Sequence, residues 1–331
     1  MKTEQIFRHA GFTQRANAIL KGGRLWLARS SRHVQGWADS LGLDVSESLA
    51  EDIGLCSVEP PEEPVKADIV IPFWEGDRHL LKRSVRSMMN QKYSDLTLHV
   101  VADGCEFPED FDDASEWPLH QTVRMYKAPK DSGPYLIANA IAHLCQTDFL
   151  GIMDADDTSR PDRMWTQIQR LQKCGGDCIS SAMVNYIGEG SNTPYMNSKI
   201  KWEPILYPGR VYEAVPRGSC VNAIRTMKLD AFRRVNGFPP IICTGDFAMD
   251  NALLFIEDPP MKVLFDMNIM GDRMLRSSSL SHGILPMGSD RRKEAVQQVL
   301  DMKNSLQRDP SEKNVRSFGG YDKPIKLERL N

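Results

Sequence analysis

The sequence predicts an α/β fold, with a mostly parallel sheet flanked by helices, and three observations lead to this prediction. From about residue 66 onward, short apolar runs alternate with longer segments whose apolar residues recur at helical spacing. This alternation is typical of parallel strands joined by crossover helices. Polar, often acidic turns follow several of the runs. The 331 residues are 41% apolar and 26% charged, an ordinary composition for a globular protein.

The first part of this pattern covers residues 67–157. Its elements follow in the order strand 67–73, helix 80–89, strand 96–102, strand 123–127, helix 135–145 and strand 149–153. Asp77 has a side chain and a position suited to capping the first helix. The last strand leads directly into Asp154. We therefore expect polar turns at the edge where open α/β sheets bind their ligands.

The second part keeps the same alternation. Its expected elements are a helix from Pro161 to Leu171, a strand at 178–185, and helices at 228–235, 250–256 and 289–306. Pro161 suits the first turn of a helix, and Gly237 suits the end of one. The polar stretch at about 187–215 is too long for an idle connection, so it is either functional or contains further secondary structure, and we favour a lid on the acceptor side.

The first 65 residues differ in charge from the rest of the chain. Residues 1–33 contain seven Lys or Arg and one acid, whereas residues 34–65 contain eight acids and no Lys or Arg. Apolar spacing in the first segment predicts two short helices, and the Pro-rich stretch 59–64 predicts a linker. We therefore expect a small helical appendage with its linker at 1–65, a main domain at 66–288, and a helix with a tail at 289–331.

Bulk properties argue against several classes of protein. A net charge of -3 argues against a nucleic-acid partner held by a general positive field. The absence of a long apolar run and of a signal-peptide pattern predicts a cytoplasmic address. Trp26 beside Arg24 and Arg29 leaves two interpretations of the appendage open, peripheral contact with the inner face of the membrane or a solvated cap on the main domain. Seven scattered cysteines are expected to be reduced.

Three carboxylates within four residues, Asp154, Asp156 and Asp157, follow the fourth expected strand. Such a cluster is costly without a compensating cation, because like charges repel. Carboxylate oxygens suit Mg²⁺ or Mn²⁺, ions that also bind substrate phosphates. The alternative is a turn whose polar side chains only cap the helix that begins near Pro161.

Five motifs occur in order along the expected sheet. They are Ile69-Val-Ile-Pro-Phe73, Met89-Asn-Gln-Lys-Tyr93, Val100-Val-Ala-Asp-Gly104, the stretch from Gly133-Pro-Tyr to Asn139, and Phe149-Leu-Gly-Ile-Met-Asp-Ala-Asp-Asp157 followed by Arg160-Pro161. In order and spacing these motifs resemble the GT-A fold, family-2-like glycosyltransferases, over roughly residues 66–285. The resemblance implies an inverting transfer of a sugar from a nucleoside-diphosphate sugar to an acceptor hydroxyl. The acceptor would be a saccharide or a lipid-linked molecule.

The resemblance also implies a donor site and a Mn²⁺ or Mg²⁺ ion acting as a Lewis acid. Its expected residues are Pro72 and Glu75 in the nucleoside pocket, Asp103 facing the base, Asn139 in the donor site, Asp154 near the ribose, Asp156 on the metal ion that bridges the diphosphate, and Asp157 beside them. Where the family often has an Arg, this chain has Ala138, so Lys127 or Lys130 would contact the donor instead. Ala102 likewise stands where the family often has an acid.

An inverting displacement needs a base that accepts the proton of the acceptor hydroxyl. In the family this base is an acid that opens a late helix, and Asp246 and Asp250 both fit the description. We expect Asp250, because it precedes the apolar run 253–255 at the spacing that the resemblance suggests. Met249 stands where another acid is usual. In the alternative interpretation, either acid only caps this helix.

The segment from Leu275 to His282 resembles the closing stretch of the family. Arg276 is expected to neutralise phosphate charge, and His282 is expected to join the metal site unless it is an ordinary surface or core histidine. Two other functions stay open. One is a non-catalytic nucleotide- or sugar-binding module of the same fold, favoured by Ala102, Ala138 and Met249. The other is a nucleotidyltransferase, although its usual basic loop would here be acidic, at residues 74–77.

Overall fold

The computed structural model describes residues 17–21, 24–28, 48–111, 122–187, 210–214, 224–275 and 289–331, and the structural statements below concern these residues. The strands are β1 (Asn17–Lys21), β2 (Arg24–Ala28), β3 (Ser48–Leu55), β4 (Val65–Phe73), β5 (Ser94–Asp103), β6 (Thr122–Ala128), β7 (Phe149–Ile152), β8 (Thr158–Ser159), β9 (Cys178–Ile187), β10 (Arg210–Ala214), β11 (Arg225–Lys228), β12 (Val263–Leu275) and β13 (Glu328–Arg329). The helices are the 3₁₀ turn η1 (Glu75–Asp77), α3 (Leu81–Met89), α4 (Gly133–Ala142), α5 (Arg163–Cys174), α6 (Leu229–Arg234), α7 (Gly245–Phe255), α8 (Asp290–Arg308) and α9 (Glu312–Phe318).

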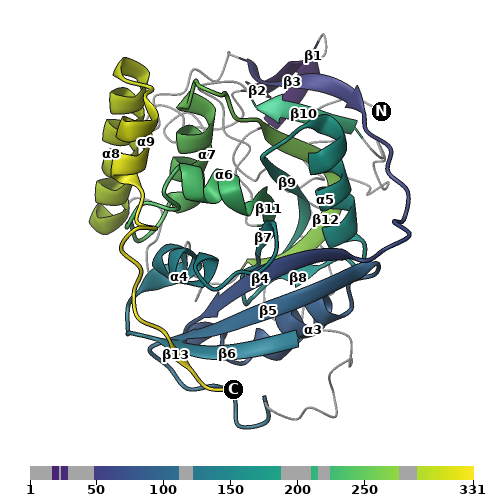
Figure 1. Cartoon of the computed structure of the whole chain (residues 1–331), viewed down its shortest axis with the longest axis vertical. Helices are drawn as coiled ribbons and strands as arrows, with labels where there is room; N and C mark the ends of the chain where they lie inside the picture. Colours follow the sequence, from purple (N-terminus) through teal and green to yellow (C-terminus); the bar gives the residue numbers. More distant parts are fainter. Residues whose placement is uncertain are drawn as a thin grey trace.

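The described strands form one sheet in the order β1-β2-β3-β10-β12-β9-β11-β7-β4-β5-β6-β13, with β8 beside β12 (Figure 1). The central strands β6, β5, β4 and β7 are parallel. β11 lies antiparallel between β7 and β9, and β9 pairs in parallel with β12. The predicted α/β class is confirmed, and the parallel strands bring the turns after β4, β5 and β7 to one edge.

Helices cover both faces of the sheet, because successive side chains of a strand point to opposite faces. On β4, Val70 packs into the cluster that includes α4, α6, α7 and α8. Its neighbours Ile69 and Ile71 pack into the cluster formed with α3 and α5. All three side chains are fully buried, as expected for a parallel strand between two helical layers.

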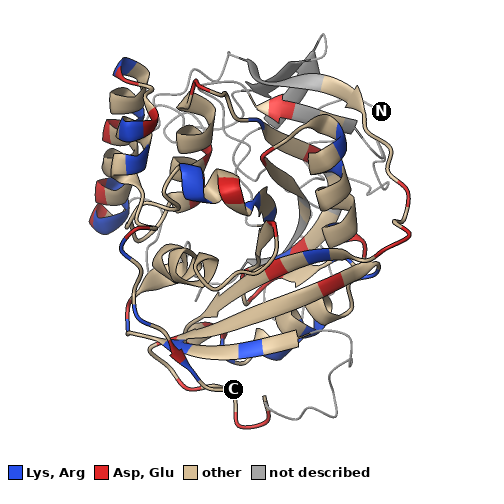
Figure 2. Ribbon diagram, in the orientation of Figure 1, with Lys and Arg blue, Asp and Glu red and all other residues tan. Residues whose placement is uncertain are grey.

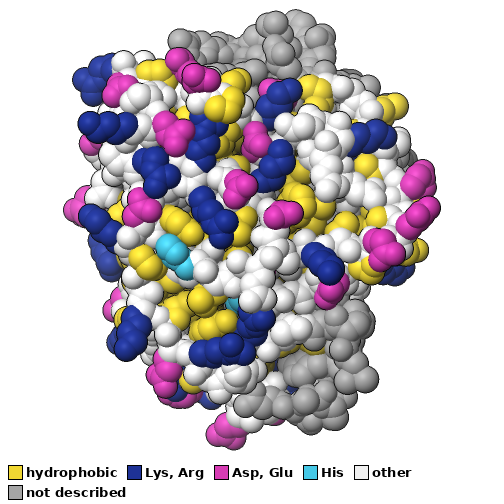
Figure 3. Space-filling model, viewed as in Figure 1, with side chains coloured by type: hydrophobic (Ala, Val, Ile, Leu, Met, Phe, Trp, Pro, Cys, Tyr) yellow, Lys and Arg dark blue, Asp and Glu magenta, His cyan; other side chains and the backbone are white. Residues whose placement is uncertain are grey.

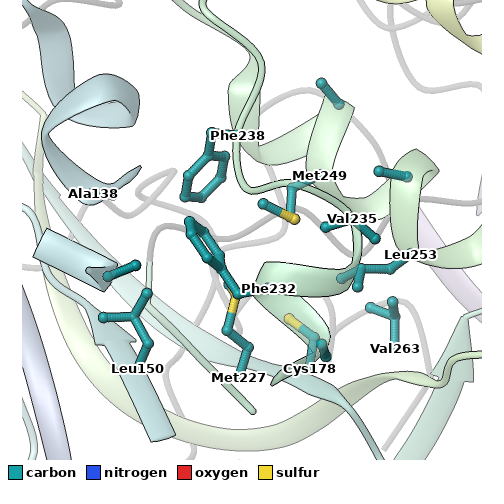
Figure 4. Packing of buried hydrophobic residues seen from close by; sticks show 14 of the residues in the cluster. Ala138, Leu150, Cys178, Met227, Phe232, Val235, Phe238, Met249, Leu253 and Val263 are labelled. Atoms are coloured by element: carbon teal, nitrogen blue, oxygen red, sulfur yellow. The ribbon is translucent and has the colours of Figure 1, made fainter. Parts of the chain in front are cut away.

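The core under α7 is built mainly from aromatic, methionine and branched aliphatic side chains (Figure 4). Phe232 of α6 packs edge-on against Phe238, with ring centroids 5.6 Å apart. Met249 and Leu253 of α7 point into the same cluster and are fully buried. This packing fixes the position of α7, which begins at Gly245.

Most of the expected elements are present, with small changes at their ends. The expected inner face of α5 is correct, since Met164, Ile168 and Leu171 are all buried. The expected Asp77 cap is wrong: α3 begins at Leu81, and Asp77 lies in the preceding 3₁₀ turn. The helix expected at 250–256 begins earlier, at Gly245.

The helices expected in the N-terminal segment are wrong for the residues described there. β1 and β2 form an antiparallel hairpin in which Ile19 faces Trp26, and β2 pairs with β3. The Gly22-Gly23 pair between the two strands in the sequence is a common hairpin signal, and it outweighs the short helical periodicity. Within the stretch expected to form a lid, 210–214 is strand β10, and 188–209 lies outside the described residues.

The C-terminal segment returns to the sheet. α8 packs on α7, and β13 then pairs with the edge strand β6 (Figure 1). α8 carries both basic and acidic residues along its length, as expected for a helix with an exposed side (Figure 2). On the face in Figure 3, positive and negative side chains are interspersed. None of the described helices has the length and apolarity that crossing a lipid bilayer requires.

Candidate active site

The acidic turn after β7 is held in place by α3. Ser84 donates its hydroxyl hydrogen to the backbone carbonyl of Asp154 over 3.0 Å. Arg83 donates to the carbonyl of Asp156 over 2.6 Å. One turn further along α3, the hydroxyl oxygen of Ser87 accepts from the N–H of Ser159, which lies in β8. The backbone of the turn is therefore anchored at several points, and these hydrogen bonds do not use the carboxylates of the turn.

The carboxylates of Asp154, Asp156 and Asp157 converge. One oxygen from each lies within 4.8 Å of the others. Burial raises the pKa of Asp154 to about 7, and the charge of Asp156 adds to this shift. Hard oxygen donors at this spacing, in a partly buried turn, fit a Mg²⁺- or Mn²⁺-sized cation.

Arg273 of β12 lies beside this turn, although the sequence alone did not point to it. β8 and β12 pair antiparallel, with Asp272 opposite Thr158, so the next position, Arg273, comes beside Asp157. Burial alone would lower the pKa of Arg273, but the charges of Asp157, Asp154 and Asp156 raise it above its usual value. The guanidinium group of Arg273 therefore offsets part of the negative charge of the acidic turn. No motif marks it, because its place depends on strand pairing across more than a hundred residues.

Asp246 lies in the first turn of α7, and its charge acts on the residues of the acidic turn. Its charge helps to raise the pKa of Asp154 and that of Arg273. The ring of Tyr135, at the start of α4, covers the preceding Gly245 so closely that a Cβ there would lie 2.7 Å from ring atoms. Burial, with the charges of Asp246 and Asp154, raises the pKa of Tyr135 well above its usual value. Tyr135 therefore packs on the first turn of α7 and is influenced by the charges of both Asp246 and Asp154.

Asp250, the base expected from the sequence, is placed differently. It is fully buried, and its carboxylate forms an ion pair of 3.0 Å with Arg225, which is also buried. Burial would lower the pKa of Arg225, but Asp250 raises it above its usual value. An acceptor hydroxyl has no access to a carboxylate in this position, so the geometry argues against Asp250 as the base. The adjacent Met249 is a core residue.

Two further residues expected in the donor site are engaged in holding α4. The carboxylate of Asp103 accepts the N–H groups of Ser132 and Gly133, each over 2.9 Å, and so caps the start of α4. Asn139 is fully buried, and its side-chain amide makes two hydrogen bonds with the backbone of Phe238, over 2.8 and 2.9 Å. Both ends of the Asn139 amide therefore hold α4 to the segment after α6, and its expected place in the donor site stays a prediction.

The other expected donor-site residues lie at the same edge or outside the described residues. Pro72 is partly exposed near the end of β4, and Glu75 is exposed in η1. Lys130 is exposed in the turn after β6, and its backbone lies against Gly104 in the turn after β5. Arg276 and His282 lie outside the described residues.

The chain matches one protein-family model, described as "Glycosyl transferase family 2", over residues 68–235, just over half of its length. This stretch contains the acidic turn and ends before α7. No curated protein sequence matches the chain significantly.

Several solved structures resemble the chain. One is GalNAc-T7 with UDP, GalNAc and Mn2+, at a TM-score of 0.53 and 13% identity, covering 78% of this chain and 54% of that one. Another is S. aureus TarS 1-349 with UDP-GlcNAc, at a TM-score of 0.49 and 13% identity, covering 79% and 76%. A third is the mannosyltransferase PcManGT from Pyrobaculum calidifontis with GDP-Man and Mn2+, at a TM-score of 0.47 and 12% identity, covering 80% and 72%. At these identities the likeness concerns the fold.

Proposed function

The chain belongs to glycosyl transferase family 2, and from this premise we propose that it is an inverting, metal-dependent enzyme. It would transfer a sugar from a nucleoside-diphosphate sugar to a hydroxyl group of a saccharide or lipid-linked acceptor. The observation that carries this proposal is the convergence of three carboxylates, within 4.8 Å, at the carboxyl edge of the parallel strands. Asp246 and Arg273 are coupled electrostatically to the same turn.

The residues of the acidic turn fit a hard divalent cation. Asp154 and Asp156 would hold it, with Asp157 beside them, and each offers a carboxylate oxygen at mutual distances that one ion can bridge. Such an ion would supply positive charge next to the departing diphosphate. Arg273 supports the same electrostatic task from the protein side, because it offsets part of the carboxylate charge.

We assign the base to Asp246 rather than Asp250. In the reaction, the acceptor oxygen bonds to the anomeric carbon, the bond from that carbon to the diphosphate oxygen breaks, and the hydroxyl proton passes to the Asp246 carboxylate. Asp246 is partly exposed at the start of α7, whereas Asp250 is buried in the Arg225 pair one helical turn further on. Asp250 then acts as a positioning residue, since its ion pair holds the helix that carries the base.

A non-catalytic binding module is the rival function, and burial weakens the argument for it. Ala102, Ala138 and Met249 suggested lost charges in the sequence, but all three are packed into the hydrophobic core. Their apolar character follows from packing in this chain. A non-catalytic module would also not need a base such as Asp246 near the acidic turn.

Donor binding and transfer test the proposal together. A panel of nucleoside-diphosphate sugars is added with and without Mn²⁺, and thermal stabilisation and sugar transfer are measured. We expect one donor to stabilise the protein in a metal-dependent way, and Asp156→Ala to remove that effect. Asp95→Ala is the matched control, because Asp95 is exposed at the other end of β5. Tight binding of a donor without transfer or hydrolysis would favour the module instead.

A further inference from the structure

Two cysteines far apart in the sequence touch on the side of α5 that faces the N-terminal segment. Cys56 directly follows β3, and Cys174 is the last residue of α5. Their Sγ atoms are 2.7 Å apart although the residues are 118 positions apart in the chain. Non-bonded heavy atoms usually stay about 3.5–4.0 Å apart. The two thiols are therefore in close contact.

Neighbouring contacts hold the two backbones together independently of the sulfur atoms. Arg170 donates to the carbonyl of Cys56 over 3.1 Å, and Lys173 donates to the carbonyl of Ser57 over 2.5 Å. Cys56 is only 4% exposed and packs in a small apolar cluster with Leu171 of α5. The last turn of α5 thus contacts the segment after β3 through two cations, an apolar side chain and a thiol.

We propose that Cys56 and Cys174 are a site of reversible oxidation, at which a low-molecular-weight disulfide such as oxidised glutathione converts the thiol pair into a protein disulfide. The site lies away from the acidic turn and is independent of the proposed transfer reaction. In the structure both cysteines are free thiols, which is the reduced state of this site.

The chemistry of this step balances within thiol–disulfide exchange. The Cys174 thiolate attacks one sulfur of the small disulfide, forms a mixed disulfide and releases one small thiolate. The Cys56 thiolate then attacks the Cys174 sulfur, forms the Cys56–Cys174 bond and releases the second. The protein loses two protons and two electrons in total, and the small disulfide gains them and is reduced to two thiols.

Accessibility distinguishes this pair from a nearby cysteine. Cys174 is partly exposed, so a small disulfide can reach it, whereas Cys178 is fully buried in the cluster on the other face of the sheet. Burial and the adjacent Cys56 raise the pKa of Cys174 to about 12, although Arg170 and Lys173 oppose the shift. The thiolate is therefore scarce at neutral pH, and exchange is slow and becomes faster in mildly alkaline buffer.

The disulfide would fasten the N-terminal segment to the main sheet. β3 precedes Cys56 and pairs with β10, which pairs with β12, the strand that carries Arg273. The loop closed by the bond spans 118 positions, and closing a long loop restricts the unfolded chain strongly. Oxidation would thus stabilise one side of the sheet without touching the donor-binding edge.

The test uses the full-length protein and a protease cut between the two cysteines. The protein is incubated with oxidised glutathione in mildly alkaline buffer, and free thiols are then alkylated. A glutamate-specific protease cuts at the exposed Glu62 and Glu63, between Cys56 and Cys174 in the chain. Under denaturing conditions, we expect the fragment that carries Cys56 and the fragment that carries Cys174 to stay joined without reductant and to separate with reductant. Their cross-linked peptide should be lighter than the two thiol peptides by two hydrogen atoms.

Matched variants show which cysteines form the bond. In Cys56→Ser and Cys174→Ser the fragments should separate without reductant, whereas Cys105→Ser, which changes a partly exposed cysteine elsewhere, should behave as the unmodified chain does. The proposal is overturned if Cys56 and Cys174 are recovered alkylated or as separate glutathione adducts, or if Cys174 is bonded to Cys178. Circular dichroism of each variant confirms that the comparison is made on folded protein.

Discussion

Exchanging Asp246 and Asp250 for asparagine, one at a time, separates a chemical role from a structural one. Both acids lie on α7, one helical turn apart, and both substitutions remove one negative charge with almost no change of volume. Asp246 is partly exposed beside the acidic turn, whereas Asp250 is buried in an ion pair of 3.0 Å with Arg225. Asp246→Asn should therefore lower the rate of transfer, whereas Asp250→Asn should lower the stability of the fold.

The expected magnitudes follow from these two environments. Loss of a general base lowers the rate by about 10²–10⁴-fold, so Asp246→Asn should lower kcat by that factor and leave donor binding and folding nearly unchanged. Asp250→Asn leaves the buried Arg225 without its counter-charge, which costs about 3–5 kcal/mol of unfolding free energy. For a domain of this size class, such a loss lowers Tm by roughly 6–20 °C.

The assay is a sugar-transfer rate at saturating donor, measured with donor affinity and thermal melting on the same preparations. Asp230→Asn on α6 is the control, because its side chain is 96% exposed and, among the described residues, is paired only in a long contact with Arg233. The assignment is refuted if Asp246→Asn keeps full turnover. It is also refuted if Asp250→Asn melts like the unmodified protein yet has lost all transfer.

Three further predictions concern the metal, a glycine and a buried carboxylate. Asp156→Ala should abolish the difference in donor-induced melting shift between samples with and without Mn²⁺; an unchanged metal effect would place the cation elsewhere. Gly245→Ala should lower the unfolding free energy by about 1–3 kcal/mol in urea titration, because its Cβ would lie 2.7 Å from an aromatic ring. Asp68 is buried, which alone would raise its pKa, but hydrogen bonds from His99 and Thr147 lower it below the usual value. Its stabilising effect is thus complete above the unfolded pKa of about 3.9 and is lost as the pH falls through the lower folded value. Asp68→Asn should therefore cost about 1.5–3 kcal/mol at neutral pH, and the gap to the unmodified protein should shrink in acid; an equal gap at pH 7 and pH 3 would contradict this.

The elements predicted best were those whose signal is local. Apolar runs and helical spacing located β4, β5, β7 and α5, and the acidic residues after β7 identified the turn where the carboxylates converge. The weakest prediction was the N-terminal segment, where a few residues of helical spacing proved to be strands. Short apolar segments are ambiguous between helix and strand until a pairing partner is known, and β1, β2 and β3 supply that partner for one another.

The sequence by itself determined the α/β class, the succession of most strands and helices, and the acidic turn, because each depends on neighbours within one element or one turn. Only the tertiary structure decided which acid of α7 reaches that turn and which is buried, since the depth of a helix in the fold is set by contacts with other elements. Tyr135 over Gly245 and Arg225 on Asp250 are such contacts. Arg273 joins the turn for the same reason, because strand pairing brings together residues that the chain keeps far apart.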